Sequence, residues 1–268
     1  MTAPAQPRSL RRPLASARPT RLSLAVHNLK VMAFRARRVA LDLVDGPPKL
    51  SADTPDAAAR IVAESRTPLW AEAATGEQAM QRGKVANLRR ACRALDGLAI
   101  PAGATFSFWR QVGRPTATRG FTEGRALKLG CMVPSVGGGL CQLSNALFDV
   151  ALQAGCDIVE RHAHSRLVPG STAAPGRDAT VAWNYVDLRF RPTVDLYVAA
   201  RVEEAELVVL LKGCADATPT AWTPSPADTA PLGAASCASC QESDCFMHER
   251  NPAAPPSTEE APRRTPFC

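Results

Sequence analysis

Three consecutive glycines that run directly into an apolar helical pattern constrain this fold more than any other feature of the chain. The glycines occupy residues 137–139, and Cys141 opens the pattern that follows them. Gly155 closes the pattern, whose apolar residues recur at helical spacing: Leu143, Leu147, Val150 and Ala151. The sequence therefore predicts a tight turn followed by a helix that carries a cysteine in its first turn.

A cysteine in the first turn of a helix faces unpaired N–H groups and the positive end of the helix dipole. Both favour the thiolate over the thiol. The segment 160–165, Glu-Arg-His-Ala-His-Ser, follows about twenty residues later and brings two histidines. A histidine that folds back onto Cys141 would complete a nucleophile–base pair.

These residue types predict a cysteine–histidine–aspartate site of the kind that performs acyl transfer. Cys141 is the predicted nucleophile and His164 the base, with His162 as the alternative base. Asp178 is the predicted orienting residue, with Asp187 as the alternative. The oxyanion donors would be the side chain of Gln142 and the backbone N–H groups at the helix start. The predicted substrate-binding residues surround them: Gly137, Gly138, Gly139, Ser144, His162 and Arg177.

Three other interpretations of the same residues stay open. Cys141 would be an ordinary buried residue if the glycines only shape a turn. The glycine run could instead bind phosphate at the helix start, although no lysine of the P-loop kind follows it. His162 and His164 share a face of a predicted strand and could bind a metal with a third ligand.

Residues 214–268 lose periodicity and are rich in Pro, Ala, Ser and Thr, which predicts a tail. The tail holds a C-x2-C-x4-C-x2-H pattern followed by a last cysteine: Cys237, Cys240, Cys245, His248 and Cys268. Such a set can hold zinc or an iron–sulfur cluster. Free thiols in a disordered tail and redox-active cysteines are the alternatives.

The net charge of +7 is concentrated at the N-terminus. Residues 1–41 contain nine Lys or Arg and no acidic residue, which leaves 23 Lys and Arg against 25 Asp and Glu in the rest of the chain. A nucleic-acid-binding core would show a basic face within the fold, so we expect no specific nucleic-acid binding.

Residues 1–21 are rich in Pro, Arg, Ser and Ala and are predicted to be disordered. Residues 22–43 predict an amphipathic basic helix. One face is apolar: Leu22, Val26, Leu29, Met32, Ala33, Ala36, Val39, Ala40 and Leu43. We expect either a helix packed on the core with its basic face in solvent or a helix lying on an anionic membrane surface; a targeting sequence is the third possibility.

No run of 18 apolar residues exists, and no uninterrupted apolar segment follows the first arginines. These observations predict neither a transmembrane helix nor a secretory signal. The nine cysteines are irregularly spaced, which favours free, catalytic or metal-binding thiols in a reducing compartment. We therefore expect a cytoplasmic protein, with peripheral membrane contact through residues 22–43.

The core is predicted to be an α+β domain over residues 60–213, because helical patterns come first and alternating patterns follow. Residues 44–59 are predicted to be a linker, so residues 22–59 comprise the helix and the linker to the core domain. Lys84–Leu95 predicts a helix with Cys92 on its buried stripe. The predicted strands form a mainly antiparallel sheet. They are 105–108, 126–134, 157–161, 180–190, and a hairpin of 195–202 with 206–212.

The ordered motifs of residues 105–213 closely resemble the VanW family, named for an accessory protein of glycopeptide-resistance operons. The resemblance rests on these segments: Phe106-Ser107-Phe108, Gly113, Gly120, 137–144, 160–165 and 176–180. It implies a link to cell-envelope metabolism and no particular reaction. The cysteine helix followed by a histidine strand is also similar to papain-like and transglutaminase-like cores.

The first hypothesis for the function is a thiol hydrolase or acyltransferase that acts on a peptide or amide. Two further hypotheses accompany it. The domain would otherwise be a non-catalytic module that binds a cell-envelope ligand at the glycine loop. The third hypothesis is an accessory protein that works through a metal or iron–sulfur cluster in its tail.

Overall fold

The computed structural model describes residues 20–70, 78–128, 131–164, 173, 176–214, 219, 223, 235 and 236. These residues form an α+β fold of four α-helices, one short 3-10 helix and three small sheets. The helices are α1 (Arg21–Asp45), α2 (Gln78–Leu95), α3 (Phe108–Val112), η1 (Ala117–Arg119) and α4 (Cys141–Gln153). The α+β prediction is confirmed.

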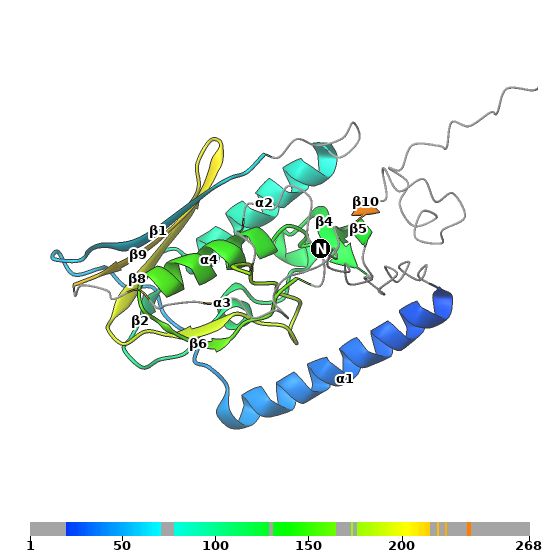
Figure 1. The fold of residues 1–268 in the computed structure, drawn as a ribbon, viewed down its shortest axis with the longest axis horizontal. Coiled ribbons are helices and arrows are strands. Elements are labelled where there is room, and N and C mark those ends of the chain that lie inside the picture. The colour runs from blue at the N-terminus through cyan, green and yellow to red at the C-terminus, as the bar shows by residue number, and fades with distance from the viewer. Residues whose placement is uncertain are drawn as a thin grey trace, which may run out of the picture.

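The largest sheet is antiparallel and has the strand order β1-β9-β8-β2. Its strands are β1 (Arg60–Pro68), β2 (Ala99–Ile100), β8 (Leu196–Val202) and β9 (Glu206–Gly213). Alternate residues of β9 enter the core, namely Leu207, Val209 and Leu211, as the two-residue period of a strand requires. The helices α2 and α4 contact this sheet and supply the other half of the core (Figure 1).

Two three-stranded sheets complete the domain, in the orders β3-β7-β6 and β10-β5-β4. Their strands are β3 (Phe106–Ser107), β4 (Glu123–Lys128), β5 (Cys131–Val136), β6 (Asp157–Glu160), β7 (Arg189–Arg191) and β10 (Ala235–Ser236). The strand β10 comes from the segment predicted as a tail and pairs in parallel with β5.

The helix α1 lies along one side of the domain (Figure 1). Arg38 forms an ion pair with Glu160 of β6 at 2.5 Å, and Asp42 one with Arg189 of β7 at 2.9 Å. The half-buried residues recur every three or four positions: Leu24, His27, Val31, Arg35, Arg38 and Asp42. Our first expectation for this helix, an apolar face against the core, is therefore wrong.

Several predicted elements agree closely with the structure. The cysteine helix, the strand near 157–161 and the hairpin of β8 and β9 lie where the patterns place them. Cys92 is buried on the core face of α2, as predicted. No helix that the structure describes has both the length and the apolar content needed to cross a bilayer.

Two predicted strands are wrong. The segment 126–134 holds parts of two strands, β4 and β5, that pair with each other. The segment 180–190 forms a turn closed by a bridge between Ala182 and Val186, and only its end joins β7. Side chains of α1 bind the backbone of that turn. Arg35 donates a hydrogen bond to the Trp183 carbonyl oxygen.

Candidate active site

The glycine turn and the first residue of α4 are fixed by close backbone packing. Gly137 has φ +78° and Gly139 has φ +94°, a region that side chains disfavour. A Cβ atom on Gly138 would overlap the carbonyl oxygen of Gly124 in β4. The turn therefore presses against β4 and presents Cys141 at the start of the helix.

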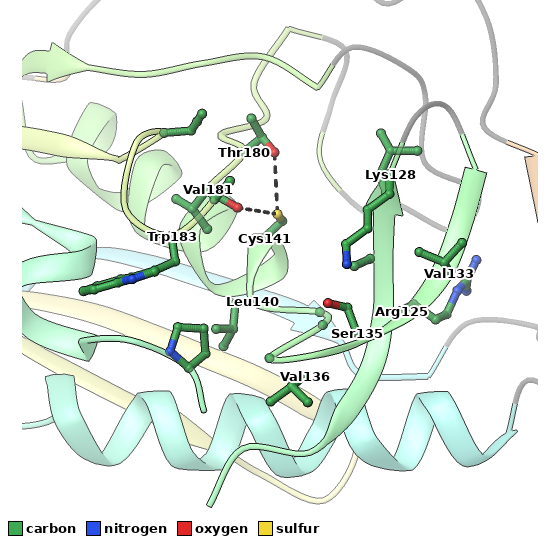
Figure 2. A pocket seen from close by; sticks show the side chains of 18 of the residues that line it. Arg125, Lys128, Val133, Ser135, Val136, Leu140, Cys141, Thr180, Val181 and Trp183 are labelled. Atoms are coloured by element: carbon green, nitrogen blue, oxygen red, sulfur yellow. Dashed lines mark hydrogen bonds between the residues drawn. The ribbon is translucent and has the colours of Figure 1, made fainter. Parts of the chain in front are cut away.

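The structure brings the predicted nucleophile and base together. Cys141 and His164 line the same cleft, and each shifts the pKa of the other. The sulfur also lies 3.6 Å from the hydroxyl oxygen of Thr180 and 3.8 Å from the carbonyl oxygen of Val181 (Figure 2). The thiol is thus surrounded by polar partners, unlike Cys92 and Cys156, which are buried in the apolar core.

Asp178 holds the imidazole of His164 from the opposite side. Its Oδ2 lies 2.5 Å from Nδ1 of His164 and accepts the backbone N–H of the same residue at 2.6 Å. Because Nδ1 is engaged, Nε2 is the ring nitrogen left for the sulfur. Arg161 in turn fixes Asp178 by two hydrogen bonds. It donates to Oδ1 of Asp178 at 3.0 Å and to the Asp178 carbonyl oxygen at 2.6 Å.

The pKa values shift in the direction of a thiolate–imidazolium pair. Burial opposes ionisation of Cys141, but the hydrogen bond and the positive charge of His164 lower the pKa of the thiol below its ordinary value. Burial also disfavours charge on His164, yet Asp178 and the Cys141 sulfur raise the pKa of the imidazole to about 10. Both shifts favour the ionised pair over the neutral one, and the thiolate is the form that a thiol nucleophile needs.

The backbone N–H of Cys141 is a donor for an oxyanion. The next two N–H groups of α4, those of Gln142 and Leu143, already donate to Gly139 and Leu140. Among the described residues no hydrogen bond engages the Cys141 N–H. A carbonyl attacked by the sulfur would place its oxygen near this N–H, which can stabilise the developing negative charge.

Four predicted roles do not fit the contacts that the structure shows. The Gln142 side chain, expected as an oxyanion donor, donates instead to Thr67 and Pro68 of β1 at 3.0 and 2.9 Å. Ser144, expected to touch substrate, is fully buried and donates to the Ala179 carbonyl oxygen. Its contact ties α4 to the segment that carries Asp178, so it positions the site.

The other two corrections concern Arg177 and Asp187. Arg177 is not among the residues that line the cleft and lies 3.6 Å from Asp149 of α4. Asp187, the alternative orienting residue, is buried against Ser107, Trp109 and Arg189 and serves the fold. Its acceptor oxygens are occupied by those partners, so it does not orient the histidine.

A cleft of about 1220 Å³ opens in front of Cys141. Its walls come from α1, α2, β4, β5, the glycine turn and the segment 180–186. Figure 2 shows Lys128 of β4 reaching towards the side of the cleft that holds Cys141, whereas the Arg125 side chain points away from the cysteine. The predicted glycines and His162 also line this cleft.

His162 pairs with Glu160 at 3.2 Å and leaves the role of base to His164. In the described part of the chain no three His, Cys, Asp or Glu side chains gather as a metal site. The predicted zinc or iron–sulfur ligands of the tail lie outside the described residues, so that hypothesis remains a prediction: Cys237, Cys240, Cys245, His248 and Cys268.

Sequence reasoning missed several residues that build the site. Arg161 fixes Asp178 and also stacks over the Phe148 ring of α4, 5.4 Å from its centroid. Its position three residues before His164 in the motif 160–165 was the only signal available. Thr180 lies in the motif 176–180 but nothing in that motif indicated its contact with Cys141, because tertiary packing alone brings it to the cysteine.

Comparison with known proteins relates this domain to a family. The family model described as "VanW like protein" matches residues 83–211. The Uncharacterized protein YoaR of Bacillus subtilis (strain 168) is 31% identical over 169 residues, which cover 62% of this chain and 55% of the relative. The Vancomycin B-type resistance protein VanW of Enterococcus faecalis (strain ATCC 700802 / V583) is 37% identical over 118 residues, 43% of each chain.

The chain thus spans about half the length of the curated relatives that it matches. No solved structure matches it. The matched range 83–211 contains the glycine turn, α4, the 160–165 motif and Asp178, so the cysteine site lies in the shared domain, whereas α1 lines the cleft from outside that range.

Proposed function

Because this chain belongs to the VanW family through residues 83–211, we propose that its shared domain is a cysteine-dependent hydrolase or acyltransferase. Its substrate would be a peptide or another amide. The observation that carries the proposal is the contact of the Cys141 thiol with an imidazole that Asp178 orients at 2.5 Å. Nucleophile, base and orienting carboxylate in this order are the parts that acyl transfer requires.

In the first step the Cys141 thiolate attacks the carbonyl carbon of the amide and forms a C–S bond. The carbonyl oxygen becomes an oxyanion beside the Cys141 N–H. When the C–N bond breaks, the proton of the His164 imidazolium passes to the leaving nitrogen, and a thioester remains.

In the second step a water molecule, or an amine or alcohol acceptor, attacks the thioester. Neutral His164 takes the proton of the attacking group, the new C–O or C–N bond forms, and the C–S bond breaks to release the thiolate. Asp178 stays ionised throughout, since its pKa, despite burial, is held below the usual range by His164.

The relatives support a role at the cell envelope. The name of the Enterococcus protein associates it with vancomycin resistance, and vancomycin resistance is the association that the family carries. We therefore place the substrate among peptides of the cell envelope, as an amide whose carbonyl can enter the cleft beside Cys141.

Acyl-enzyme trapping tests the proposal. We expect p-nitrophenyl acetate to acetylate Cys141, as seen by peptide mass spectrometry, and the acyl group to turn over. Cys141→Ser should lose this adduct, and His164→Gln should slow both its formation and its hydrolysis by about a hundredfold, the scale of general acid–base catalysis. Cys156→Ser, a change at a buried core thiol, is the matched control.

Wild-type protein that forms no adduct at Cys141, while its exposed Cys214 reacts, would contradict the proposal. The same result would favour the alternative of a non-catalytic module that binds an envelope ligand in this cleft.

A further inference from the structure

The large apolar side chains that the structure leaves exposed gather on one helix. In the described part of the chain, α1 carries nine of the thirteen such side chains: Leu22, Val26, Leu29, Met32, Phe34, Val39, Leu41, Leu43 and Val44. None of the 25 residues of this helix, all of which the structure describes, is buried. Single exposed apolar residues need no explanation, whereas a contiguous group of them marks a surface that binds a partner.

The inward side of α1 is held to the domain by polar contacts. Arg38 and Asp42 form ion pairs with residues of β6 and β7, and Arg35 donates to a carbonyl oxygen of the segment 180–186. These contacts fix how the helix is rotated about its axis. The side that faces away from the domain is therefore set by the structure.

This outward side carries an apolar stripe. The stripe is defined as Leu22, Val26, Leu29, Ala33, Ala36, Ala40 and Leu43, which follow one another at alternating steps of four and three residues. Leu22, Leu29 and Leu43 are 74%, 68% and 81% exposed. Figure 1 shows α1 at the edge of the domain, so the apolar stripe faces outward along the length of the helix.

Positive charge borders the apolar stripe. Lys30 and Arg37 are exposed residues on its flank, and among the described residues neither has an ion-pair partner. Residues 1–41 hold nine basic residues and no acidic one. An apolar stripe beside exposed basic residues is the pattern of a helix that lies in the interface of an anionic membrane.

A second copy of α1 is the main alternative partner, because steps of four and three residues also suit a two-helix coiled coil. In that packing the residues beside the apolar stripe face each other and pair by opposite charge. Here those positions include Lys30 and Arg37 and no acidic residue. The middle of the stripe is Ala33, Ala36 and Ala40, which bury little apolar surface against another helix. An anionic bilayer meets both features better.

We propose that α1 docks on an anionic bilayer, with the apolar stripe at the boundary of headgroups and acyl chains and the basic residues on the lipid phosphates. The docking does not depend on the proposed function, but it bears on where the cleft lies. Leu24, His27 and Val31, on the inward side of the same helix, line that cleft. A helix with its side chains is about 10 Å across, so docking holds the cleft near the headgroups.

Flotation with lipid vesicles tests the docking. The full chain should bind phosphatidylglycerol–phosphatidylcholine vesicles at least about tenfold more than pure phosphatidylcholine vesicles. Leu29→Glu with Ala36→Glu should abolish binding, whereas Ile61→Glu, at an exposed apolar residue of β1, should not. Lys30→Gln with Arg37→Gln should weaken binding by roughly thirtyfold, because each basic residue near an anionic surface contributes about fivefold. All of these side chains are exposed, so the melting temperature should stay that of the wild type.

Quenching by brominated lipid shows which side of α1 meets the bilayer. The ring of Leu29→Trp would lie among the acyl chains, whereas that of Ile61→Trp, the matched control, would stay in water. Both variants keep the four native tryptophans, so the difference between them reports the introduced ring. In vesicles that contain phosphatidylglycerol, Leu29→Trp should lose at least about twice as much emission as the control.

Several results would overturn the proposal. Equal binding to both kinds of vesicle would remove the anionic partner. Binding that survives Leu29→Glu with Ala36→Glu, or equal quenching of the two tryptophan variants, would mean that another segment meets the lipid. A dimer in sedimentation that the Leu29→Glu change dissolves would assign the apolar stripe to a second copy of the chain.

Discussion

At the scale of single residues, the lowered pKa of Cys141 depends on the pocket more than on the helix start. Burial raises this pKa, while His164, Val181 and Thr180 lower it. Two other cysteines show the opposite case, because burial raises the pKa of Cys92 and of Cys156 to about 12. Of these three cysteines, the one beside the imidazole has the lowered pKa.

The pH dependence of alkylation follows from the lowered pKa of Cys141. An ordinary thiol loses reactivity about tenfold for each pH unit below its pKa. We expect the iodoacetamide rate at Cys141 to fall less between pH 9 and pH 7 than that of N-acetylcysteine, which slows by more than about tenfold. Site-resolved mass spectrometry gives the rate, and parallel profiles for the two thiols would show that no thiolate is stabilised.

Asp178 is predicted to maintain the charge of His164. Asp178→Asn keeps the shape of the side chain and removes the carboxylate, so the imidazole pKa should fall by at least two units from about 10. NMR titration of the His164 ring measures this value. Asp149→Asn, whose carboxylate faces Arg177, is the control and should leave the ring unchanged. An unaltered His164 pKa in Asp178→Asn would refute this role.

At the scale of elements, the turn before α4 shows how one backbone contact places the reactive residue. Gly138 meets the backbone of Gly124 in β4, and Asn87 of α2 donates to the Gly138 carbonyl oxygen at 2.9 Å. The sequence predicted a turn here, but the need for three glycines became visible only from the strand that packs on them.

Gly138→Ala should therefore destabilise the protein and displace the start of α4. The added Cβ overlaps the Gly124 carbonyl oxygen, and overpacking of this kind costs about 3 kcal/mol. Gly103→Ala is the control, since Gly103 has φ +76° with open space around it and should lose only about 1 kcal/mol. Urea unfolding measures both, and equal losses would mean that the clash relaxes freely.

At the scale of the whole molecule, sequence patterns predicted the elements whose neighbours lie close along the chain. The hairpin of β8 and β9 and the stripes of α2 and α4 are of this kind. The patterns failed where contacts between segments far apart in the sequence determine the structure. One example is α1, whose apolar side faces away from the core. The segment 180–190 failed for the same reason, because side chains of α1 bind its backbone.

The residues of the candidate site show the same contrast between local motifs and contacts of distant segments. Cys141, His164 and Asp178 could be predicted from residue type and spacing, since each lies in a short distinctive motif. The true partners of Gln142 and Ser144 could not, because they come from β1 and from residue 179. Hydrogen-bond partners are set by three-dimensional neighbours, and periodicity carries no information about them.

The ionised pair also shapes the pH dependence of stability for the whole protein. The raised pKa of His164 stabilises the fold fully below about pH 6.5, its unfolded value, and that contribution declines as pH rises towards 10. The lowered pKa of Cys141 stabilises the fold fully above about pH 8.5, its unfolded value, and that contribution declines as pH falls. The two slopes therefore oppose each other below about pH 8.5, and the His164 slope acts alone between about pH 8.5 and pH 10.

The free energy of unfolding that the pair contributes should therefore fall as the pH rises from about 8.5 towards 10. The expected slope is about 1.4 kcal/mol per pH unit for the one proton that His164 releases on unfolding. Urea unfolding of the wild type and of Cys141→Ser with His164→Gln from pH 7 to pH 10 gives the difference directly. A difference that stays constant above pH 8.5 would mean a neutral imidazole in the native state, because only a native imidazolium makes unfolding release a proton there.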